Sequence, residues 1–421
     1  MISSNARIWI WITQALGYNT PKVRRIYELY SDVSDFYNGG EREWRFCGIF
    51  TQNDINKLKS VNISVADRII SRCNELNYSI LAVDDEKYPQ CLRNIECPPA
   101  VIYVSGTLPD VDNRLTIGIV GTRRATKYGR DNSYKFGYAL AKYGVATVSG
   151  GALGVDCASH RGSLAADGVT ICVRGCGINA NYLSENAGMR NAITKRGAVI
   201  SEYPPDETPR NYYFPARNRI IAALSDGVLI IESGARSGSL ITANLAGEMG
   251  KKVYALLGNN SPQNEGSNER IKDGTAIPVT DFMDILTSFD NLYATSDKVD
   301  FDNLSLEDME AIPVKGMPKL REKKSKENSK ERLSLQDNSN KKSSENKNKI
   351  DNSKKEIKHI ENLDLNTTAQ SVYDYIGNEP VHVDKIAADL NIPVFKVLAA
   401  ITTLEIKGVI QALQGRRYIL K

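Results

Sequence analysis

Short apolar runs alternate with helical segments through the middle of this chain, and this alternation constrains its fold more than any other feature. Most of the runs are apolar at consecutive positions, as strands covered on both faces are. The runs are VIYVSG, TIGIVG, GVATVSG, VTICVRG, GAVISEY, GVLIIES and KKVYALLG, and helical segments at 129–143, 156–167, 184–196, 216–224 and 238–249 lie between them. This order predicts an α/β fold with a doubly wound, mostly parallel sheet over residues 81–290.

The two ends of the chain predict smaller domains of other kinds. Residues 1–80 contain several segments with an apolar face at helical spacing, which predicts an N-terminal helical domain. Residues 361–421 contain three helical patterns followed by two short strands around Gly415. Three helices and a β-hairpin are the elements of a winged helix, a variant of the helix-turn-helix.

Residues 291–360 have the composition of a linker. Within them, residues 319–358 hold 14 Lys and Arg against 7 Asp and Glu and almost no apolar residue. Such a segment cannot bury enough surface to fold, so we expect a disordered basic linker that acts as a solvated tether or attracts nucleic acid weakly. Because the whole chain has a net charge of +4, the rest carries −3. A polyanion would therefore bind to a local patch.

Composition also excludes several classes of protein. No apolar run has the length of a membrane span, and the N-terminus lacks the features of a secretory leader, so we expect a cytoplasmic protein without membrane contact. The seven cysteines are an odd number and are scattered, which indicates free thiols in a reducing compartment. No histidine cluster accompanies the closest pair, Cys172 and Cys176. We expect neither a metal nor a cofactor.

Arginine, glycine and hydroxyl side chains follow four of the predicted strands. In an open parallel sheet, ligands bind beyond the carboxyl ends of the strands. Guanidinium groups and free N–H groups are the donors that phosphate oxygens prefer, so we expect a phosphate-binding site at this edge. Its candidate residues are Gly121, Thr122, Arg123, Arg124, Ser149, Gly150, Gly151, Arg217, Asn218, Arg219, Arg236, Ser237, Gly238 and Ser239.

Two of these arginines raise an electrostatic question. If the helix spans 216–224, Arg217 and Arg219 lie in its first turn, where a cation is unfavourable by about 0.3–1 kcal/mol. An external phosphate would explain them, because one charge-assisted hydrogen bond contributes about 1.5–3 kcal/mol. The alternative is internal pairing of either arginine with Glu202, Asp206 or Asp226. The aromatic residues 212–214 just before them have two readings as well: stacking on bases or packing beneath the loop.

The catalytic motifs of common α/β enzymes are missing. GIVGTRR departs from the dinucleotide-binding fingerprint, and the chain has no phosphate-binding loop of the G-x-x-x-x-G-K-[ST] type. His160, four residues after Asp156 on one predicted helix, has a core or capping role as its simplest interpretation. No arrangement of a nucleophile and a base is evident. We therefore assign no catalytic residue and expect a binding protein rather than an enzyme.

Taken together, these segments resemble a known family. IVGTRRATKYG, VSGGALGVDCASHRGSL, RGCGINANY, the long run from VISEYPP to ITANLA, and GSNERIKDGTAIP resemble the DNA-processing protein A family, DprA or Smf. The resemblance covers about residues 80–285. The N-terminal helices are similar to the family's variable helical domain, with a helix-hairpin-helix-like pattern, and residues 361–421 are similar to its C-terminal winged helix.

The resemblance implies a function. It implies a Rossmann-like domain that binds single-stranded DNA without regard to sequence, in a homodimer that delivers the strand to the recombinase RecA and helps it displace single-strand-binding protein. The setting would be natural transformation, or competence, and DNA recombination. The family's phosphate-binding positions match Arg123, the segment from Arg217 to Arg219, and the turn from Arg236 to Ser239. Leu153 and Leu257 depart from the arginine and proline that many members carry.

Two alternatives belong to other classes. Nucleotide hydrolases of the lysine-decarboxylase-like Rossmann group carry a catalytic glutamate in a P-G-G-x-G-T-x-x-E stretch. ESGARSGSLITA has no acid at the comparable place, which favours a binding protein. A winged-helix transcription regulator would use Arg416 and Arg417 in its wing. The predicted recognition helix offers only Lys396 and Lys407 as cations, beside Glu405. We interpret this domain as a surface for a partner or for dimerisation.

Overall fold

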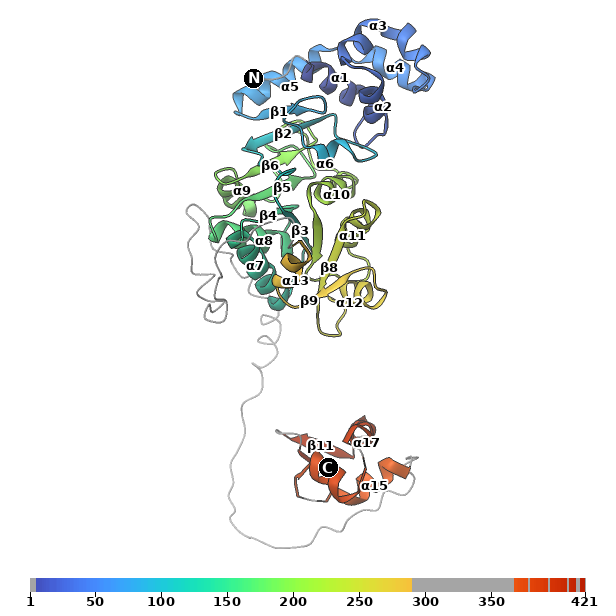
Figure 1. Ribbon diagram of the computed structural model, residues 1–421, viewed down its shortest axis with the longest axis vertical. Helices are drawn as coiled ribbons and strands as arrows, with labels where there is room; N and C mark the ends of the chain where they lie inside the picture. The colour runs from blue at the N-terminus through green and yellow to red at the C-terminus, as the bar shows by residue number, and fades with distance from the viewer. Residues whose placement is uncertain are drawn as a thin grey trace, which may run out of the picture. The chain divides into compact units, whose positions relative to one another are not determined.

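The computed structural model describes residues 5–289 and 367–420, except 378, 393, 407–408 and 414–416 (Figure 1). The chain divides into two units, Met1–Lys323 and Lys324–Lys421. The basic linker predicted at 291–360, including the boundary at its start, lies outside the described residues. The domain boundaries therefore stay predictions. In the described ranges, no helix combines the length and the apolar character that a membrane span requires.

Five helices form the N-terminal part of the first unit, which agrees with the predicted helical character of this region. They are α1 (Ala6–Leu16), α2 (Lys22–Leu29), α3 (Val33–Phe46), α4 (Gln52–Ser60) and α5 (Ser64–Glu75). Trp11 lies at their centre, with its ring 6.4 Å from that of Phe36 and 5.8 Å from that of Trp44. Helix α4 begins at a capping box, in which Thr51 and Asp54 satisfy each other's main-chain N–H. These helices lie at the β1 end of the sheet (Figure 1).

A nine-stranded sheet forms the centre of the first unit. Its strands are β1 (Ser79–Ala82), β2 (Val101–Gly106), β3 (Thr116–Val120), β4 (Ala146–Ser149), β5 (Thr170–Arg174), β6 (Ala198–Ser201), β7 (Gly227–Ile230), β8 (Lys252–Leu256) and β9 (Ile277–Val279). The order is β1-β2-β6-β5-β4-β3-β7-β8-β9. Strands β1 and β2 pair antiparallel, and β2 pairs antiparallel with β6. The other pairs are parallel, which confirms the mostly parallel α/β fold.

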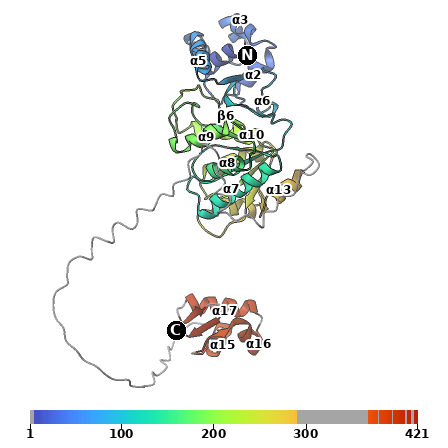
Figure 2. The ribbon, with the colours of Figure 1, turned by 90° about the vertical axis from the view of Figure 1, so that its left-hand side faces the viewer.

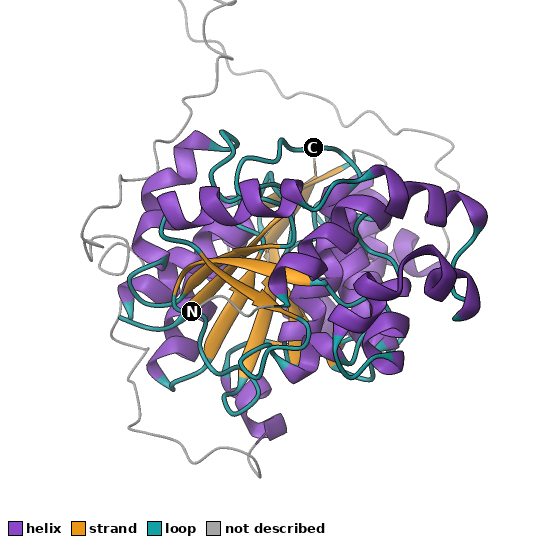
Figure 3. Ribbon diagram, turned by 90° about the horizontal axis from the view of Figure 1, so that it is seen from above, coloured by secondary structure: helices purple, strands orange, loops and turns teal. Residues whose placement is uncertain are grey.

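Helices cover both faces of this sheet (Figures 1 and 3). Figure 1 shows α7 (Lys127–Lys142), α8 (Val155–Ala165) and α9 (Ala187–Ile193) on one side, and α10 (Tyr213–Leu224), α11 (Gly238–Glu248) and α12 (Glu265–Lys272) on the other. The short helices α6 (Gln90–Arg93) and α13 (Met283–Leu286) complete the layers. This double cover explains why β3 to β7 are buried along their whole length.

Helix α10 begins three residues earlier than the sequence predicts. It starts at Tyr213, so Pro215 is its third residue. Proline is tolerated there because the first N–H groups of a helix have no acceptor inside the helix. Arg217 and Arg219 are consequently the fifth and seventh residues, and the prediction that they lie in the first turn is wrong. The electrostatic cost of a cation in the first turn therefore does not apply to these two arginines.

Helices α7 and α8, which lie side by side in Figure 2, meet at glycines, and this contact gives a stability prediction. A Cβ atom on Gly162 would lie 2.1 Å from the carbonyl oxygen of Tyr134 and 2.8 Å from the nitrogen of Tyr138. Because both are main-chain atoms, Gly162→Ala should lower the free energy of unfolding by about 1–3 kcal/mol, the cost of overpacking. Gly247→Ala is the control, since that Cβ meets nothing within 4 Å, and we expect about 0.4–1 kcal/mol of stabilisation. Urea unfolding measures both, and equal stability of the two variants would contradict the close contact.

The second unit is a winged helix. It contains α15 (Thr367–Tyr375), β10 (Val381–His382), α16 (Val383–Asp389), α17 (Val394–Ile406), β11 (Ile410–Leu413) and β12 (Arg417–Leu420), with strand order β10-β12-β11. Val372, Ile386 and Leu404, from three different helices, are among the fully buried residues of its core. The prediction of three helices and a hairpin is confirmed, with β10 as an added edge strand. Lys407, Gly415 and Arg416 lie outside the described residues.

Candidate nucleic-acid interface

A small pocket opens where β3, β4 and β5 end, beside the start of α10. Its free volume is about 20 Å³, where one water molecule needs about 10–15 Å³. It lies beside β3, the strand at which the order of the sheet reverses, and such points are where open α/β sheets bind ligands. The residues that line it include Arg123, Gly150, Gly151, Arg174, Tyr182, Arg190, Phe214 and Arg217.

Four arginines converge on this pocket from different elements. Arg123 lies in the loop after β3, Arg174 ends β5, Arg190 belongs to α9, and Arg217 belongs to α10. None of the described residues that line the pocket is a carboxylate. Among the residues that the structure describes, no acidic group lies within ion-pair distance of these four guanidiniums. The pocket is therefore strongly cationic and suited to an anion.

Arg217 lines the pocket but is held by main-chain contacts and is not a free, exposed side chain. Its side chain is almost fully buried, and Nη1 donates to the carbonyl oxygens of Gly150, at 2.9 Å, and Val173. The guanidinium lies so close to Gly150 that a Cβ there would be 2.5 Å from Nη2. Burial lowers the pKa of Arg217, and the nearby Asp156 carboxyl opposes this shift. Arg217 thus connects the ends of β4 and β5, and its buried guanidinium adds positive charge to the pocket.

Arg174 and Arg190 are site residues that the sequence reasoning missed. Arg174 is 4% exposed, and its Nη2 donates to Cys176 Sγ and to the Ala180 carbonyl oxygen, both at 3.1 Å. Its Nη1 is buried without a hydrogen-bond partner. Arg190 Nη1 donates to the Leu183 carbonyl oxygen at 2.9 Å. The sequence does carry a signal for Arg174, since it directly follows the apolar run VTICV, and Arg123 likewise comes shortly after the run TIGIV.

Aromatic side chains flank the cationic pocket, with Arg123 above one of them. The exposed Arg123 has its guanidinium carbon 5.3 Å from the ring centroid of Phe214, which lies 5.2 Å from the ring of Tyr182. Tyr213 is buried and stacks on Tyr203 at 3.9 Å, whereas Tyr212 is 61% exposed. Tyr213 therefore packs in the core, whereas Tyr212 is exposed and Phe214 is half-buried, so stacking on bases stays a prediction for these two residues.

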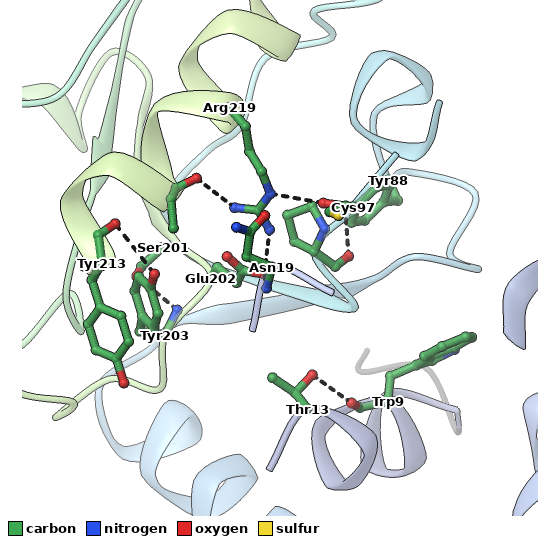
Figure 4. A network of polar contacts seen from close by, with 12 residues as sticks. Trp9, Thr13, Asn19, Tyr88, Cys97, Ser201, Glu202, Tyr203, Tyr213 and Arg219 are labelled. Atoms are coloured by element: carbon green, nitrogen blue, oxygen red, sulfur yellow. Dashed lines mark hydrogen bonds and ion pairs between the residues drawn. The ribbon is translucent and has the colours of Figure 1, made fainter. Parts of the chain in front are cut away.

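Arg219 points away from the pocket into an internal network. Its Nη2 lies 2.6 Å from Glu202 Oε1, with side chains only 7% and 3% exposed, and its Nε donates to the Cys97 carbonyl oxygen at 2.9 Å. Figure 4 shows this pair beside Asn19, whose main-chain N–H also donates to Glu202 Oε1. This geometry matches the internal alternative for Arg219. The side chain links α10 to the end of β6 and to the N-terminal helices.

The comparisons with known proteins follow the same division of the chain. The family described as DNA recombination-mediator protein A matches residues 79–290, and the DprA winged helix domain matches residues 361–416. This chain belongs to the DprA family. The resemblance inferred from the sequence motifs is therefore confirmed.

Relatives and a solved structure agree with this assignment. DNA processing protein DprA of Bacillus subtilis is 37% identical over 45% of this chain and 64% of its own length. Protein Smf of Escherichia coli is 39% identical over 50% of this chain and 56% of its own length. The chain thus spans less than two thirds of these curated relatives. The solved structure of DprA from Streptococcus pneumoniae has a TM-score of 0.59 and 27% identity, over 68% of this chain and 98% of that one.

The remaining candidate residues of this DprA-family chain lie beside the pocket rather than in it. Ser149 Oγ donates to the Ile119 carbonyl oxygen at 2.6 Å, and Thr122 Oγ1 accepts from the N–H of Arg124 at 3.2 Å. Gly121 lies so close to Val155 that a Cβ there would be 2.5 Å from it. These contacts shape the loops after β3 and β4.

A second group of candidates gathers where α11 begins. Asn218 Nδ2 donates to the Gly238 carbonyl oxygen at 3.2 Å, which connects α10 to the start of α11. The hydroxyl groups of Ser237 and Ser239 lie 2.7 Å apart, and Arg236 is exposed. Apart from Arg219, the structure thus places the predicted residues in two neighbouring groups, one at or beside the pocket and one at the turn after β7.

Glu232 is a further residue that the sequence reasoning did not single out. It is buried at the end of the β7 run, and its Oε2 accepts from the N–H of Thr126, the N-cap of α7, at 2.8 Å. Its carbonyl oxygen accepts from the N–H of Thr122 at 2.8 Å. A Cβ on Gly129 would lie 2.1 Å from Oε2. Glu232 therefore fixes the Arg123 loop against β7.

The buried acid and histidine of α8 take structural roles. Asp156 Oδ2 accepts from the N–H of Ala152 at 3.3 Å, and burial raises the pKa of its carboxyl group. His160 is fully buried, and its Nδ1 lies 2.7 Å from Thr170 Oγ1. Burial lowers the pKa of His160 to about 3, so its ring is neutral at pH 7. This is the core role that the sequence predicts for His160.

Proposed function

We propose that this chain binds single-stranded DNA without regard to sequence, through the cationic pocket and the loops around it. The observation that carries the proposal is the convergence of four guanidiniums, without a lining carboxylate among the described residues, at the ligand-binding edge of the sheet. Phosphate oxygens are the natural acceptors for such a group. The description of the family as a recombination mediator, and the names of its relatives as DNA processing proteins, support DNA as the polyanion.

A single strand fits this edge better than a duplex does. Phe214 and Tyr182 line the cationic pocket, and Tyr212, two residues before Phe214, is exposed. Unpaired bases stack on such rings. In a duplex the bases stack on one another and are not available to these rings. The small pocket is also far too narrow for a double helix.

We propose binding rather than catalysis because of the contacts that the acid and the histidine of α8 make. Asp156 and His160 are buried and already hold main-chain and hydroxyl groups. A general base must reach the proton that it removes, and neither group is available for that. From the family assignment, we extend the proposal to a cytoplasmic homodimer that delivers the strand to the RecA recombinase during recombination and natural transformation.

Binding of three ligands to the full-length protein tests the proposal. A labelled single strand, the corresponding duplex and a mononucleotide are titrated under the same salt conditions, and anisotropy gives each affinity. We expect the single strand to bind most tightly, because only it offers both repeated phosphates and free base faces. Preference for the mononucleotide would favour the nucleotide-hydrolase alternative. Preference for the duplex would favour a winged-helix regulator.

Sequence independence is a separate prediction. Stacking on an aromatic ring contributes about 1–3 kcal/mol per base and is tolerant of sequence. Oligo-dT and a mixed-sequence strand of equal length should therefore bind with affinities within a few-fold of each other. Anisotropy titrations at one salt concentration measure this. A hundredfold preference for one sequence would show that bases are read by hydrogen bonds and would contradict the proposal.

A further inference from the structure

The inner part of the pocket holds more positive charge than one internal phosphate of a strand can neutralise. Four guanidiniums line it, and the nearest buried acid, Asp156, holds the loop behind Arg217 through the N–H of Ala152. An internal phosphodiester carries a single negative charge. A phosphate monoester at the end of a strand carries about 1.5 to 2 negative charges at pH 7. The charge of the pocket therefore matches an end better than an internal link.

Arg174 shows that the pocket has a donor without an acceptor. Its side chain is more than nine-tenths buried, it lines the pocket, and its Nη1 has no hydrogen-bond partner. A buried guanidinium without an acidic partner is unfavourable, so the negative charge of an anion in the pocket offsets the charge of Arg174. Arg190, on the neighbouring α9, lines the same part of the pocket and has one of its nitrogens on the Leu183 carbonyl oxygen.

The size of the pocket selects the kind of group that enters. The free volume of about 20 Å³ in this open pocket is too small for a nucleobase, so only a small group such as the oxygens of one phosphate can enter it. A terminal phosphate presents three free oxygens to Arg174 and Arg190, and only one nucleotide is attached to it. An internal phosphate has two free oxygens and must leave room for nucleotides on both sides, next to the rings of Tyr182 and Phe214.

We infer that the pocket binds the terminal phosphate monoester of a single strand, so that this protein prefers strand ends that carry a phosphate. Arg174 and Arg190 are the residues that distinguish a terminal phosphate, while the exposed Arg123 contacts terminal and internal phosphates alike. The inference rests on the proposed function, since it names which part of a single strand occupies the same site.

Four strands of one sequence and length test the inference with the full-length protein. They carry a 5′-phosphate, a 3′-phosphate, hydroxyl groups at both ends, or no end because the strand is circular. We expect at least one phosphorylated strand to bind about tenfold more tightly than the hydroxyl and circular strands, the effect of one added charge-assisted hydrogen bond. Equal affinity for all four would overturn the inference and leave the proposed function standing. Binding of none of them would overturn both.

Variants of the inner arginines connect the preference to the pocket. In Arg190→Gln and Arg174→Gln, the ratio of affinities for phosphorylated and hydroxyl strands should fall to near one. Thermal melting shows whether each variant folds, and the half-buried Arg190 tests the inference if loss of the buried Arg174 unfolds the chain. Arg196→Gln is the matched control, because it removes one positive charge from an exposed pair with Asp167 and should keep the ratio. A preference that survives in a folded Arg190→Gln variant would overturn the assignment to this pocket.

A competing source of the same chemistry is a free phosphate monoester. Inorganic phosphate and thymidine monophosphate are therefore added as competitors against the phosphorylated strand. We expect displacement only at concentrations far above that of the strand, because a free monoester lacks the contacts of the strand with Arg123 and the aromatic rings. Displacement at equal concentrations would show that the pocket recognises a free nucleotide instead and would overturn the inference.

Discussion

Arg123→Ala is expected to weaken single-strand binding by about tenfold or more, the effect of at least one lost charge-assisted contact to phosphate, and to leave the melting temperature unchanged. The side chain is exposed, lines the cationic pocket and lies over the ring of Phe214. Each lost phosphate contact should also flatten the dependence of log K on log salt by about 0.7. Anisotropy titrations at several salt concentrations give both quantities from one variant.

Arg124→Ala is the matched comparison for this result. Arg124 is exposed in the same loop and carries the same charge, but it does not line the pocket. We expect a smaller loss of affinity from Arg124→Ala than from Arg123→Ala. Equal losses would show that binding follows the charge of the loop as a whole. An unchanged affinity and slope for Arg123→Ala would remove the pocket from the binding site.

Arg219→Gln should have the largest effect on stability. The substitution would leave Glu202 as a buried carboxylate without its partner, which typically costs about 3–5 kcal/mol. The N-terminal helices should loosen as well, because Asn19 contacts the same carboxylate. Differential scanning fluorimetry should show a fall of about 6 °C or more for a chain of this size. Single-strand affinity, measured on the folded protein, should change little.

Two further variants test the origin of that loss. Arg196→Gln breaks an ion pair whose side chains are 50% and 75% exposed, and exposed pairs contribute at most about 1 kcal/mol. Replacing Arg219 by Met together with Glu202 by Leu removes both buried charges and should recover much of the stability. If Arg219→Gln melts normally and fails to bind DNA, the side chain grips phosphate and the internal interpretation is wrong.

The layered fold could be predicted because it follows from local patterns. Consecutive apolar residues such as those of β3 and β5 belong to strands buried on both faces, and that property is visible in the sequence. The rule that ligands bind at the carboxyl ends of strands also brought Arg123, Gly150 and Arg217 to one edge, and the structure places these three around one pocket.

The roles of the arginines on α10 could not be predicted in the same way. The helix starts at Tyr213, and this shift turns Arg217 toward β4 and β5 and Arg219 toward Glu202. Which partner each side chain finds depends on how α10 lies across the sheet, which no local pattern encodes.

Arg174 is absent from the predicted site for another reason. It is the last residue of β5 itself, whereas the rule for open sheets points to the loops beyond the carboxyl ends of the strands.

Photocrosslinking of the full-length protein to a strand that contains 5-iodouracil tests the central claim, that single-stranded DNA lies at the cationic pocket. Iodouracil couples to aromatic rings that stack on it, and mass spectrometry of the digested complex identifies the linked residues. The account predicts crosslinks to Phe214 or Tyr182, the aromatic rings that line the pocket. Crosslinks confined to residues 367–420 would place the strand on the winged helix and contradict the account.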